Sequence, residues 1–328
     1  MYLKHRKLRL AILVLAAFVV GCAQEKPEYV FSEEELRVVS SQLIDSAAAL
    51  RLTPTMTATL PEDADSTAVA RLLGGLSAKA WIMVEDSTGR LITQKDAHRR
   101  MDPASLTKMM TCMLALEKGC MGDTVEVTPD VFLTNDSRVK PGDRYLLGNL
   151  VREMMLQSDN NAANAIAKHI AGGIGDFCKL MNRKAAYLGM EGTHFSNPNG
   201  LTADSTYTTA RDLLVLVRYC MRDSAFAATV GTAFADVPLL DGRHLPCPNT
   251  NLLLGGYEGC IGVKTGWTRR AGGCLASAAR RDGVTLMLVV LGSKSHAARF
   301  TESATLLDYG FRIGEGELKR SEGGVKGE

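Results

Sequence analysis

The chain has 328 residues, of which 46% are hydrophobic and 23% charged, and its formal net charge is +2. That length and apolar content are ample for one large or two small packed domains. Beyond the first ten residues no basic block marks a nucleic-acid surface, and an aromatic content of 6% offers few base-stacking side chains. Nucleic acid is therefore excluded as an expected partner.

The first 22 residues have the pattern of an export signal. Lysine and arginine side chains precede an apolar run from Leu10 to Val20, which is too short for a comfortable membrane span. The string Val19-Val20-Gly21-Cys22 resembles the bacterial lipobox, in which the cysteine is lipidated; an ordinary signal or a short anchor helix is the alternative. We predict a lipoprotein signal peptide over 1–22, lipidation of Cys22, and an exported, periplasmic or cell-surface protein tethered to a bacterial membrane.

The cysteines specify neither a bridge nor a metal site. Of eight cysteines, seven remain once Cys22 is set aside, so at least one thiol is free or paired with another chain. No CxxC pair and no HExxH string is present. We therefore predict no metal and no cofactor, and expect most cysteines to be small core residues.

The remaining chain divides into an extension, a core and a tail. Residues 23–75 are predicted to be an N-terminal extension, with a helix that starts at the capping box Ser32–Glu35 and a linker rich in Pro, Thr and Asp. We predict a catalytic domain over 76–313 and a polar tail over 314–328.

Within this domain, strands are predicted at both ends and helices in the middle. The predicted strands cover 80–86, 91–95, 124–127, 259–264, 273–280 and 285–292. The predicted helices open at 102–104 and cover 146–156, 162–171, 177–188, 209–221 and 299–312. This order predicts an α+β sandwich, in which both chain ends complete an antiparallel sheet that is flanked by helices and carries a helical insertion.

The string Ser105-Leu-Thr-Lys108 falls in the first turn of the helix that Pro103 opens. Lys108 lies three residues after Ser105 on the same helix face, so its amine can remove the hydroxyl proton. The backbone N–H of Ser105 has no intrahelical partner at that position and is free to stabilise an oxyanion. Because the ordinary pKa of lysine is about 10.4, we expect burial and a second cation, Lys264, to lower it.

A second Ser-x-x-Lys string, Ser137-Arg-Val-Lys140, occurs further along the chain. It precedes Pro141-Gly142 in a predicted loop, with no helix to align the two side chains. Sequence context therefore selects Ser105 as the candidate nucleophile.

The string Ser158-Asp159-Asn160 lies between two predicted helices. The hydroxyl of Ser158 is placed to relay a proton, and the amide of Asn160 to bind a substrate peptide group. The alternative is that these residues simply cap the following helix.

The string Lys264-Thr265-Gly266 ends a predicted strand. Its ammonium and hydroxyl suit a substrate that ends in a carboxylate, and its glycine lets a ligand backbone approach closely. The N–H of Trp267 is the expected second oxyanion donor, and Thr268 adds a hydroxyl. A plain strand edge that ends in a turn is the alternative.

In this order, the three strings resemble the motifs of serine D-Ala-D-Ala carboxypeptidases, the low-molecular-mass penicillin-binding proteins. The resemblance spans 76–313 and extends to the strings 102–111, 140–144, 194–201, 209–212 and 264–272. It implies a β-lactamase/transpeptidase-like fold, and removal of the terminal D-Ala from peptidoglycan stem pentapeptides through an acyl-enzyme. Penicillins and other β-lactams would acylate the same serine.

By the same resemblance, Ser105 is the nucleophile and Lys108 the base, with Ser158 and Asn160 as the second element. Lys264 and Thr265 then bind the carboxylate end of the peptidoglycan stem peptide.

The sequence also departs from this family. The second string is usually Ser-Gly-Asn there, and its Ser-Asp-Asn form resembles β-lactamases. No arginine is found near 293–295, where members often have one, so carboxylate binding is expected to differ. A polar stretch follows Arg312, where typical members carry a β-rich domain and an amphipathic membrane helix; if Cys22 is lipidated, an N-terminal anchor replaces that helix.

Three alternatives remain open. A class A-like β-lactamase needs a further Glu to activate water, and no convincing Glu-x-x-x-Asn string lies between Asn160 and Lys264. A non-catalytic penicillin- or peptidoglycan-binding sensor is disfavoured because all the reactive residues are present. An esterase, endopeptidase or transpeptidase would share the acyl-enzyme.

Overall fold

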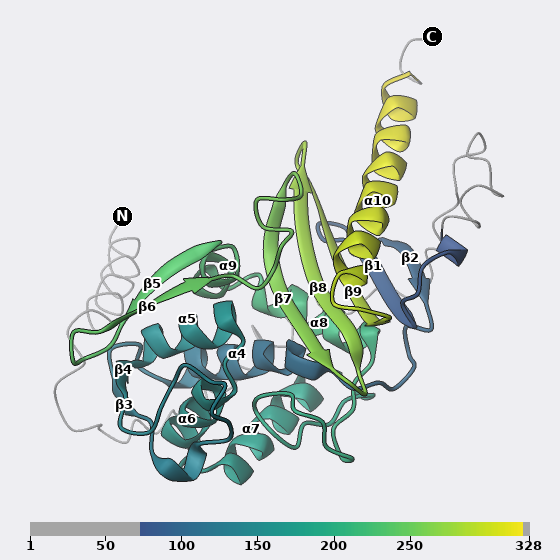
Figure 1. Ribbon diagram of the computed structural model, residues 1–328. Coiled ribbons are helices and arrows are strands. Elements are labelled where there is room, and N and C mark those ends of the chain that lie inside the picture. The colour runs from purple at the N-terminus through teal and green to yellow at the C-terminus, as the bar shows by residue number, and fades with distance from the viewer. Residues whose placement is uncertain (1–72, 324–328) are drawn as a thin grey trace, which may run out of the picture. The chain divides into compact units, whose positions relative to one another are not determined.

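The computed structural model describes residues 73–323, with side chains to residue 313, and these belong to one compact unit (Figure 1). The predicted signal peptide, Cys22, and the helix and linker predicted before residue 73 lie outside the described residues. Among the described helices, none combines the length and apolar character needed to cross a bilayer.

A five-stranded antiparallel sheet forms the centre of the described structure. Its strands run in the order β2-β1-β9-β8-β7. Their bounds are β1 (Ala80–Glu85), β2 (Leu91–Lys95), β7 (Cys260–Thr268), β8 (Gly272–Arg281) and β9 (Val284–Ser293). Because β1 pairs with β9, with Trp81 opposite Val290, both ends of the domain meet in the sheet, as predicted. Strand β7 lies at one edge and exposes a row of backbone groups that no neighbouring strand pairs.

Side chains alternate between the two faces of this sheet, as strand geometry requires. In β1, Ala80, Ile82 and Val84 join the larger apolar core, while Trp81 and Met83 join a second one. The larger core packs against α8 (Ala210–Cys220) and the helical insertion, and the second packs against α10 (Ala298–Gly323). The sheet is therefore covered on both faces, which confirms the predicted α+β sandwich.

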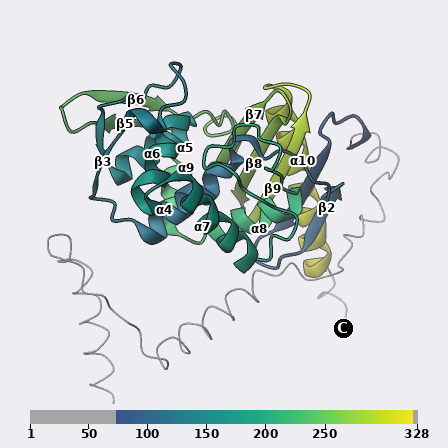
Figure 2. The same ribbon diagram turned by 90° about the horizontal axis from the view of Figure 1, so that it is seen from below.

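The helical insertion gathers on one side of the sheet, as the view from below shows (Figure 2). It contains α4 (Lys108–Lys118), α5 (Leu147–Gln157), α6 (Asn160–Ala171), α7 (Ile174–Tyr187) and α9 (Ser224–Val230). Two small sheets accompany it, formed by β3 (Thr124–Glu126) with β4 (Arg144–Leu146) and by β5 (Phe234–Pro238) with β6 (His244–Pro248). Strands β4 to β6 and helix α9 are not predicted from the sequence, because the three strands are short or contain proline and α9 has only seven residues.

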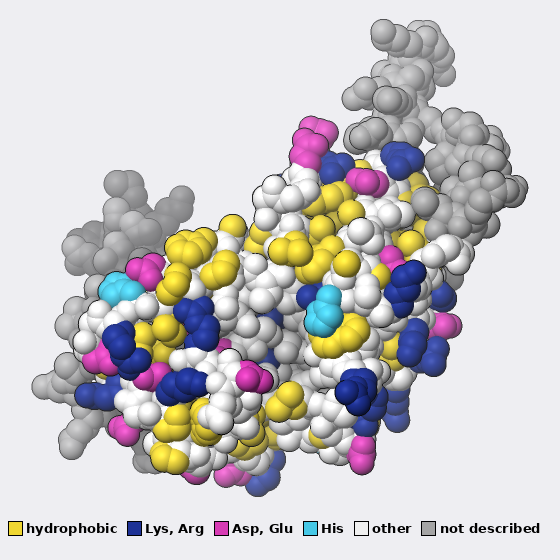
Figure 3. All heavy atoms as spheres, viewed as in Figure 1, with side chains coloured by type: hydrophobic (Ala, Val, Ile, Leu, Met, Phe, Trp, Pro, Cys, Tyr) yellow, Lys and Arg dark blue, Asp and Glu magenta, His cyan; other side chains and the backbone are white. Residues whose placement is uncertain are grey.

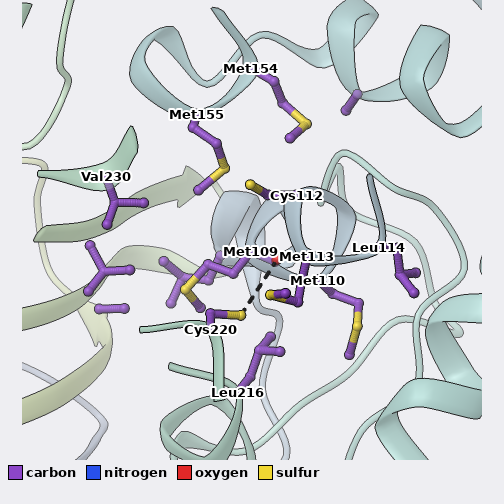
Figure 4. Close-up of a cluster of buried hydrophobic side chains, with 14 of the residues drawn as sticks. Met109, Met110, Cys112, Met113, Leu114, Met154, Met155, Leu216, Cys220 and Val230 are labelled. Atoms are coloured by element: carbon purple, nitrogen blue, oxygen red, sulfur yellow. Dashed lines mark hydrogen bonds between the residues drawn. The ribbon is translucent and has the colours of Figure 1, made fainter. Parts of the chain in front are cut away.

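Helix α4 is the best-buried helix of the insertion and is packed by sulfur-containing side chains (Figure 4). Its own methionines, Met109, Met110 and Met113, belong to the same apolar core as Met154 and Met155 of α5, which lie on the Cys112 side of the helix. Flexible thioethers fill irregular gaps between helices that rigid side chains would leave empty. The start of α4 is thereby fixed from several sides.

The last helix is longer than predicted. The sequence predicts an end at Arg312 and a polar tail after residue 313, whereas α10 continues to Gly323. Its first half buries Leu306, Leu307 and Tyr309 against the sheet, which sets the helix direction for the residues that follow.

The packing of α10 gives a stability prediction. Leu306 is fully buried, so Leu306→Ala is expected to lower the free energy of unfolding by about 2–5 kcal/mol through the cavity it leaves. Leu252 is 67% exposed, and Leu252→Ala is expected to change it by less than about 0.5 kcal/mol. Urea denaturation measures both, and equal losses would contradict this assignment of the core.

Candidate active site

Ser105 lies in a short 3-10 turn, Ala104–Thr107, and not in the first turn of an α-helix as predicted. The α-helix itself begins at Lys108. The difference originates at Ala104, whose φ of +48° lies in the left-handed region that residues with a Cβ rarely adopt. This conformation turns the chain sharply just before the candidate nucleophile.

Two glycines allow neighbouring backbone segments to touch this turn. A Cβ on Gly200, where φ is +84°, would lie 1.9 Å from the carbonyl oxygen of Ala104. A Cβ on Gly266 would lie 3.0 Å from the Cβ of Ala104 and 3.1 Å from the backbone nitrogen of Ser105. The close approach that the sequence analysis assigned to a ligand at Gly266 is thus made by the turn that carries Ser105.

The Lys108 ammonium lies within hydrogen-bond distance of Ser105. Its Nζ is 3.0 Å from Ser105 Oγ, 2.7 Å from Asn160 Oδ1 and 2.5 Å from the carbonyl oxygen of Asn199. The predicted residues Ser105, Lys108 and Asn160 are therefore together, whereas Ser158 is not among the hydrogen-bond partners of Lys108. The contact of Asn199 with Lys108 is not predicted from the sequence, although Asn199 lies in the string 194–201 that resembles the family.

Burial sets the basicity of Lys108. The side chain has no exposed surface, and desolvation lowers its pKa from 10.5 to about 7, against the opposing charge of Asp159. Burial, one of the two causes expected from the sequence, is thus the main one, and the other expected cause, Lys264, is not among the groups that act on this pKa. Lys264 is itself buried, and desolvation followed by the charges of Lys108 and Arg299 holds its pKa well below the ordinary value.

The string Ser158-Asp159-Asn160 joins two helices through an αL residue, Ser158. The Asp159 carboxylate caps α6 by accepting from the N–H of Ala162 at 2.9 Å. It also accepts from Ser137 Oγ at 2.6 Å. Both interpretations of the string therefore apply: Asp159 caps a helix while Asn160 contacts Lys108. The second Ser-x-x-Lys string supports this loop and lies outside the reactive group.

Strand β7 places Lys264 and Thr265 beside the turn that carries Ser105. Lys264 Nζ donates to the carbonyl oxygen of Thr265 at 3.1 Å, and the Thr265 hydroxyl lies 2.7 Å from that of Thr250. Further along, Trp267 stacks on His296 with ring centroids 4.0 Å apart. Because β7 is an edge strand, its free backbone groups are available to an extended ligand.

Arg299 supplies a cation that the sequence analysis did not find. Its Nη1 donates to the carbonyl oxygen of Gly266 at 2.7 Å, and its Nε is buried without a hydrogen-bond partner among the described residues. Desolvation lowers its pKa. The expected arginine was sought near 293–295, at the end of β9, but it lies on the first turn of α10.

The site opens on the face between β7 and the helical insertion, where Lys and Arg side chains are visible inside a hollow (Figure 3). Three basic side chains gather here: Lys108 contacts the Ser105 hydroxyl, and the charges of Lys108 and Arg299 both act on Lys264. This charge suits a ligand that ends in a carboxylate. Among the described residues, no group of three or more His, Cys, Asp or Glu side chains is arranged to hold a metal ion.

A family model of D-alanyl-D-alanine carboxypeptidases, peptidase family S11, matches residues 65–295. The chain belongs to this family. The resemblance found in the sequence is thereby confirmed.

Named relatives and a solved structure agree with membership of family S11. The chain is 31% identical to the D-alanyl-D-alanine carboxypeptidase DacF of Bacillus subtilis and 33% identical to DacC of Escherichia coli, over 71% and 73% of its length. In both cases the match spans 62% of the relative's length. The Streptomyces K15 DD-transpeptidase structure has a TM-score of 0.68 at 30% identity and covers 72% of this chain and 98% of its own.

The packing at Gly200 gives a test of the site. In Gly200→Ala, the new Cβ collides with the Ala104 carbonyl, so we expect covalent labelling by fluorescent penicillin to slow by about 100-fold as Ser105 is displaced. Gly142→Ala is the control: its φ is also positive, at +89°, but its Cβ would meet nothing within 4 Å. Equal labelling rates for both variants would show that this contact does not position Ser105.

Proposed function

We propose that this protein is a serine D-alanyl-D-alanine carboxypeptidase that removes the terminal D-Ala from peptidoglycan stem pentapeptides. The observation that carries the proposal is the buried Lys108 amine, 3.0 Å from the Ser105 hydroxyl, with its pKa lowered to about 7. Such an amine is partly neutral near pH 7 and can accept the hydroxyl proton. Membership of family S11 supports the choice of substrate.

In the first half of the reaction, Lys108 takes the proton of Ser105 as Oγ attacks the carbonyl carbon between the last two D-Ala residues. The backbone N–H groups of Ser105 and Trp267 stabilise the oxyanion. When the intermediate collapses, the terminal D-Ala leaves as an amine and receives a proton from Lys108, relayed by the Ser158 hydroxyl. Water then cleaves the ester and restores Ser105.

The basic and hydroxyl side chains at β7 bind the carboxylate end of the substrate. The terminal carboxylate binds the ammonium of Lys264 and the hydroxyl of Thr265, with Arg299 close to the same strand. Asn160 hydrogen-bonds a peptide group of the stem, and Thr268 contributes a further hydroxyl. The stem peptide lies extended along the free edge of β7, as peptides do on exposed sheet edges. β-Lactams, which also carry a carboxylate, acylate Ser105 as covalent inhibitors.

We also propose that residues 1–22 direct export and that Cys22 is lipidated, which anchors the protein at a bacterial membrane on the periplasmic or cell-surface side. Residues 23–75 then space a catalytic domain, 76–313, from that membrane, and 314–328 contribute a polar end. The basic residues, the short apolar run and the Gly21-Cys22 pair support this assignment. Metabolic labelling with an alkyne fatty acid, lost in Cys22→Ser, is its test.

Product analysis with a defined pentapeptide tests the activity. Release of one D-Ala per peptide is expected from the wild type and none from Ser105→Ala. Ser137→Ala, in the competing Ser-x-x-Lys string, is expected to keep the activity, because Ser137 supports Asp159 and does not react. Transfer of the peptide to an added amine instead of water would indicate a transpeptidase. A wild type that neither releases D-Ala nor binds penicillin covalently would contradict the proposal.

The pKa of Lys108 predicts the pH dependence of acylation. Only the neutral amine accepts a proton, so the rate is expected to rise with pH through about 7 and to fall by about tenfold for each pH unit below it. Asp159 raises this pKa, so Asp159→Asn is expected to move the rise to lower pH, whereas the exposed Asp136→Asn leaves it in place. Stopped-flow penicillin acylation measures both shifts; a rise toward higher pH in Asp159→Asn would contradict the electrostatic assignment.

The fate of the penicilloyl-enzyme distinguishes this activity from that of a β-lactamase. The carboxylate whose charge affects the pKa of Lys108 is that of Asp159. Its oxygens accept hydrogen bonds from the N–H of Ala162 and from Ser137, so it is not placed to activate a deacylating water. We expect the adduct to persist for minutes or longer, as intact-mass spectrometry would show. Rapid turnover of penicillin would support the β-lactamase alternative.

A further inference from the structure

Arg270 joins three segments that surround Ser105. It lies in the turn after β7, and its Nε and Nη2 donate to the two carboxylate oxygens of Asp102, the Nη2 bond measuring 2.8 Å. Nη2 also donates to the carbonyl oxygen of Ala203 at 2.7 Å, and Nη1 donates to Asp204 at 2.8 Å. One guanidinium therefore connects the β7 turn with the segment before Ser105 and with the loop after Gly200.

These segments are the ones that meet at the nucleophile. Asp102 lies three residues before Ser105, and the loop that contains Ala203 begins with Asn199, whose carbonyl oxygen contacts Lys108. Gly200 and Gly266 bring the loop and the strand into contact with Ala104. The proposed oxyanion donors lie on two of the segments, one on the turn of Ser105 and one on β7. Their separation therefore depends on how these segments are held together.

We propose that Arg270 is a positioning residue, whose guanidinium fixes the separation between the Ser105 turn, the Asn199 loop and the end of β7. The inference deepens the proposed function and rests on it, because the distance it sets is that between the two oxyanion donors. Arg270 lies three residues after Trp267 and has no part in the proton transfers.

The chemistry of arginine suits this role. Its planar fork binds one carboxylate through two parallel hydrogen bonds and still has N–H groups left for other acceptors. The Asp102 side chain is only 11% exposed, whereas those of Arg270 and Asp204 are 42% and 103% exposed. Of the two ion pairs that Arg270 makes, the one with Asp102 is therefore the stronger. The pair with Asp204 is exposed to solvent, and salt screens it more.

The test compares two adjacent arginines that carry the same charge. Arg270→Gln is expected to lower the second-order rate constant of penicillin acylation by about tenfold, because a small misplacement of the donors is costly. Arg269→Gln removes an equal charge from an exposed neighbour in the same turn and is expected to match the wild type. Arg270→Lys, which lacks the fork, is expected to fall between them. A rate for Arg270→Gln equal to that of Arg269→Gln would overturn the proposal.

Two further measurements separate positioning from a general loss of stability. In the Arg270→Gln background, Asp102→Asn is expected to slow acylation no further, because the pair acts as a unit. Added salt is expected to slow the wild type and Arg269→Gln but to have less effect on Arg270→Gln. Independent, multiplying effects of Arg270→Gln and Asp102→Asn would contradict a shared role.

Amide hydrogen exchange provides a readout that needs no reaction with penicillin. Met101 and Thr208 exchange two backbone hydrogen bonds of 2.8 Å close to the Arg270 contacts. We expect their amides to exchange faster in Arg270→Gln than in Arg269→Gln, with the core strands unchanged. A wild type that is inert to penicillin would reject the proposed function, whereas unchanged exchange at these two amides would reject the positioning role.

Discussion

The burial of one lysine ammonium beside a serine hydroxyl is the constraint on which the rest of the site depends. Moving an amine out of water disfavours its charged form, and in Lys108 this desolvation outweighs the attraction of Asp159. The cost is tolerable because Asn160 and the carbonyl oxygen of Asn199 accept its hydrogen bonds. Burial thus turns an ordinary strong base into one suited to neutral pH.

The fold supplies that environment by converging several backbone segments on one point. The thioether-rich core holds α4 in place, the loop before α6 brings in Asn160, and the loop at 199–200 supplies a carbonyl oxygen. Strand β7 closes the fourth side, at the edge of a sheet that both ends of the domain complete. These contacts join residues more than fifty positions apart, so no short stretch of the chain forms the site alone.

Much of this arrangement is predictable from the sequence, because helix and strand periods are local and the three strings have a distinctive order. What was missed depends on tertiary contacts. The left-handed Ala104 packs against two distant glycines that leave room for it, and the contact of Asn199 is made by a backbone atom that any residue carries. The position of Arg299 at the site is not predicted, because Arg299 lies on helix α10 and not at the end of the adjacent strand β9. The structural role of Asp159, the middle residue of Ser-Asp-Asn, depends on its hydrogen bond with the distant Ser137, which the sequence does not reveal.

The cysteines lead to a different kind of conclusion. In the part of the chain that the structure describes, seven are present and none forms a disulfide. Five are buried, and burial raises the pKa of the thiols of Cys178 and Cys274 to about 11. Because oxidants attack the thiolate form, these thiols are unreactive toward oxidants at neutral pH. In the described residues these thiols therefore contribute to the fold as small apolar packing groups and not as cross-links.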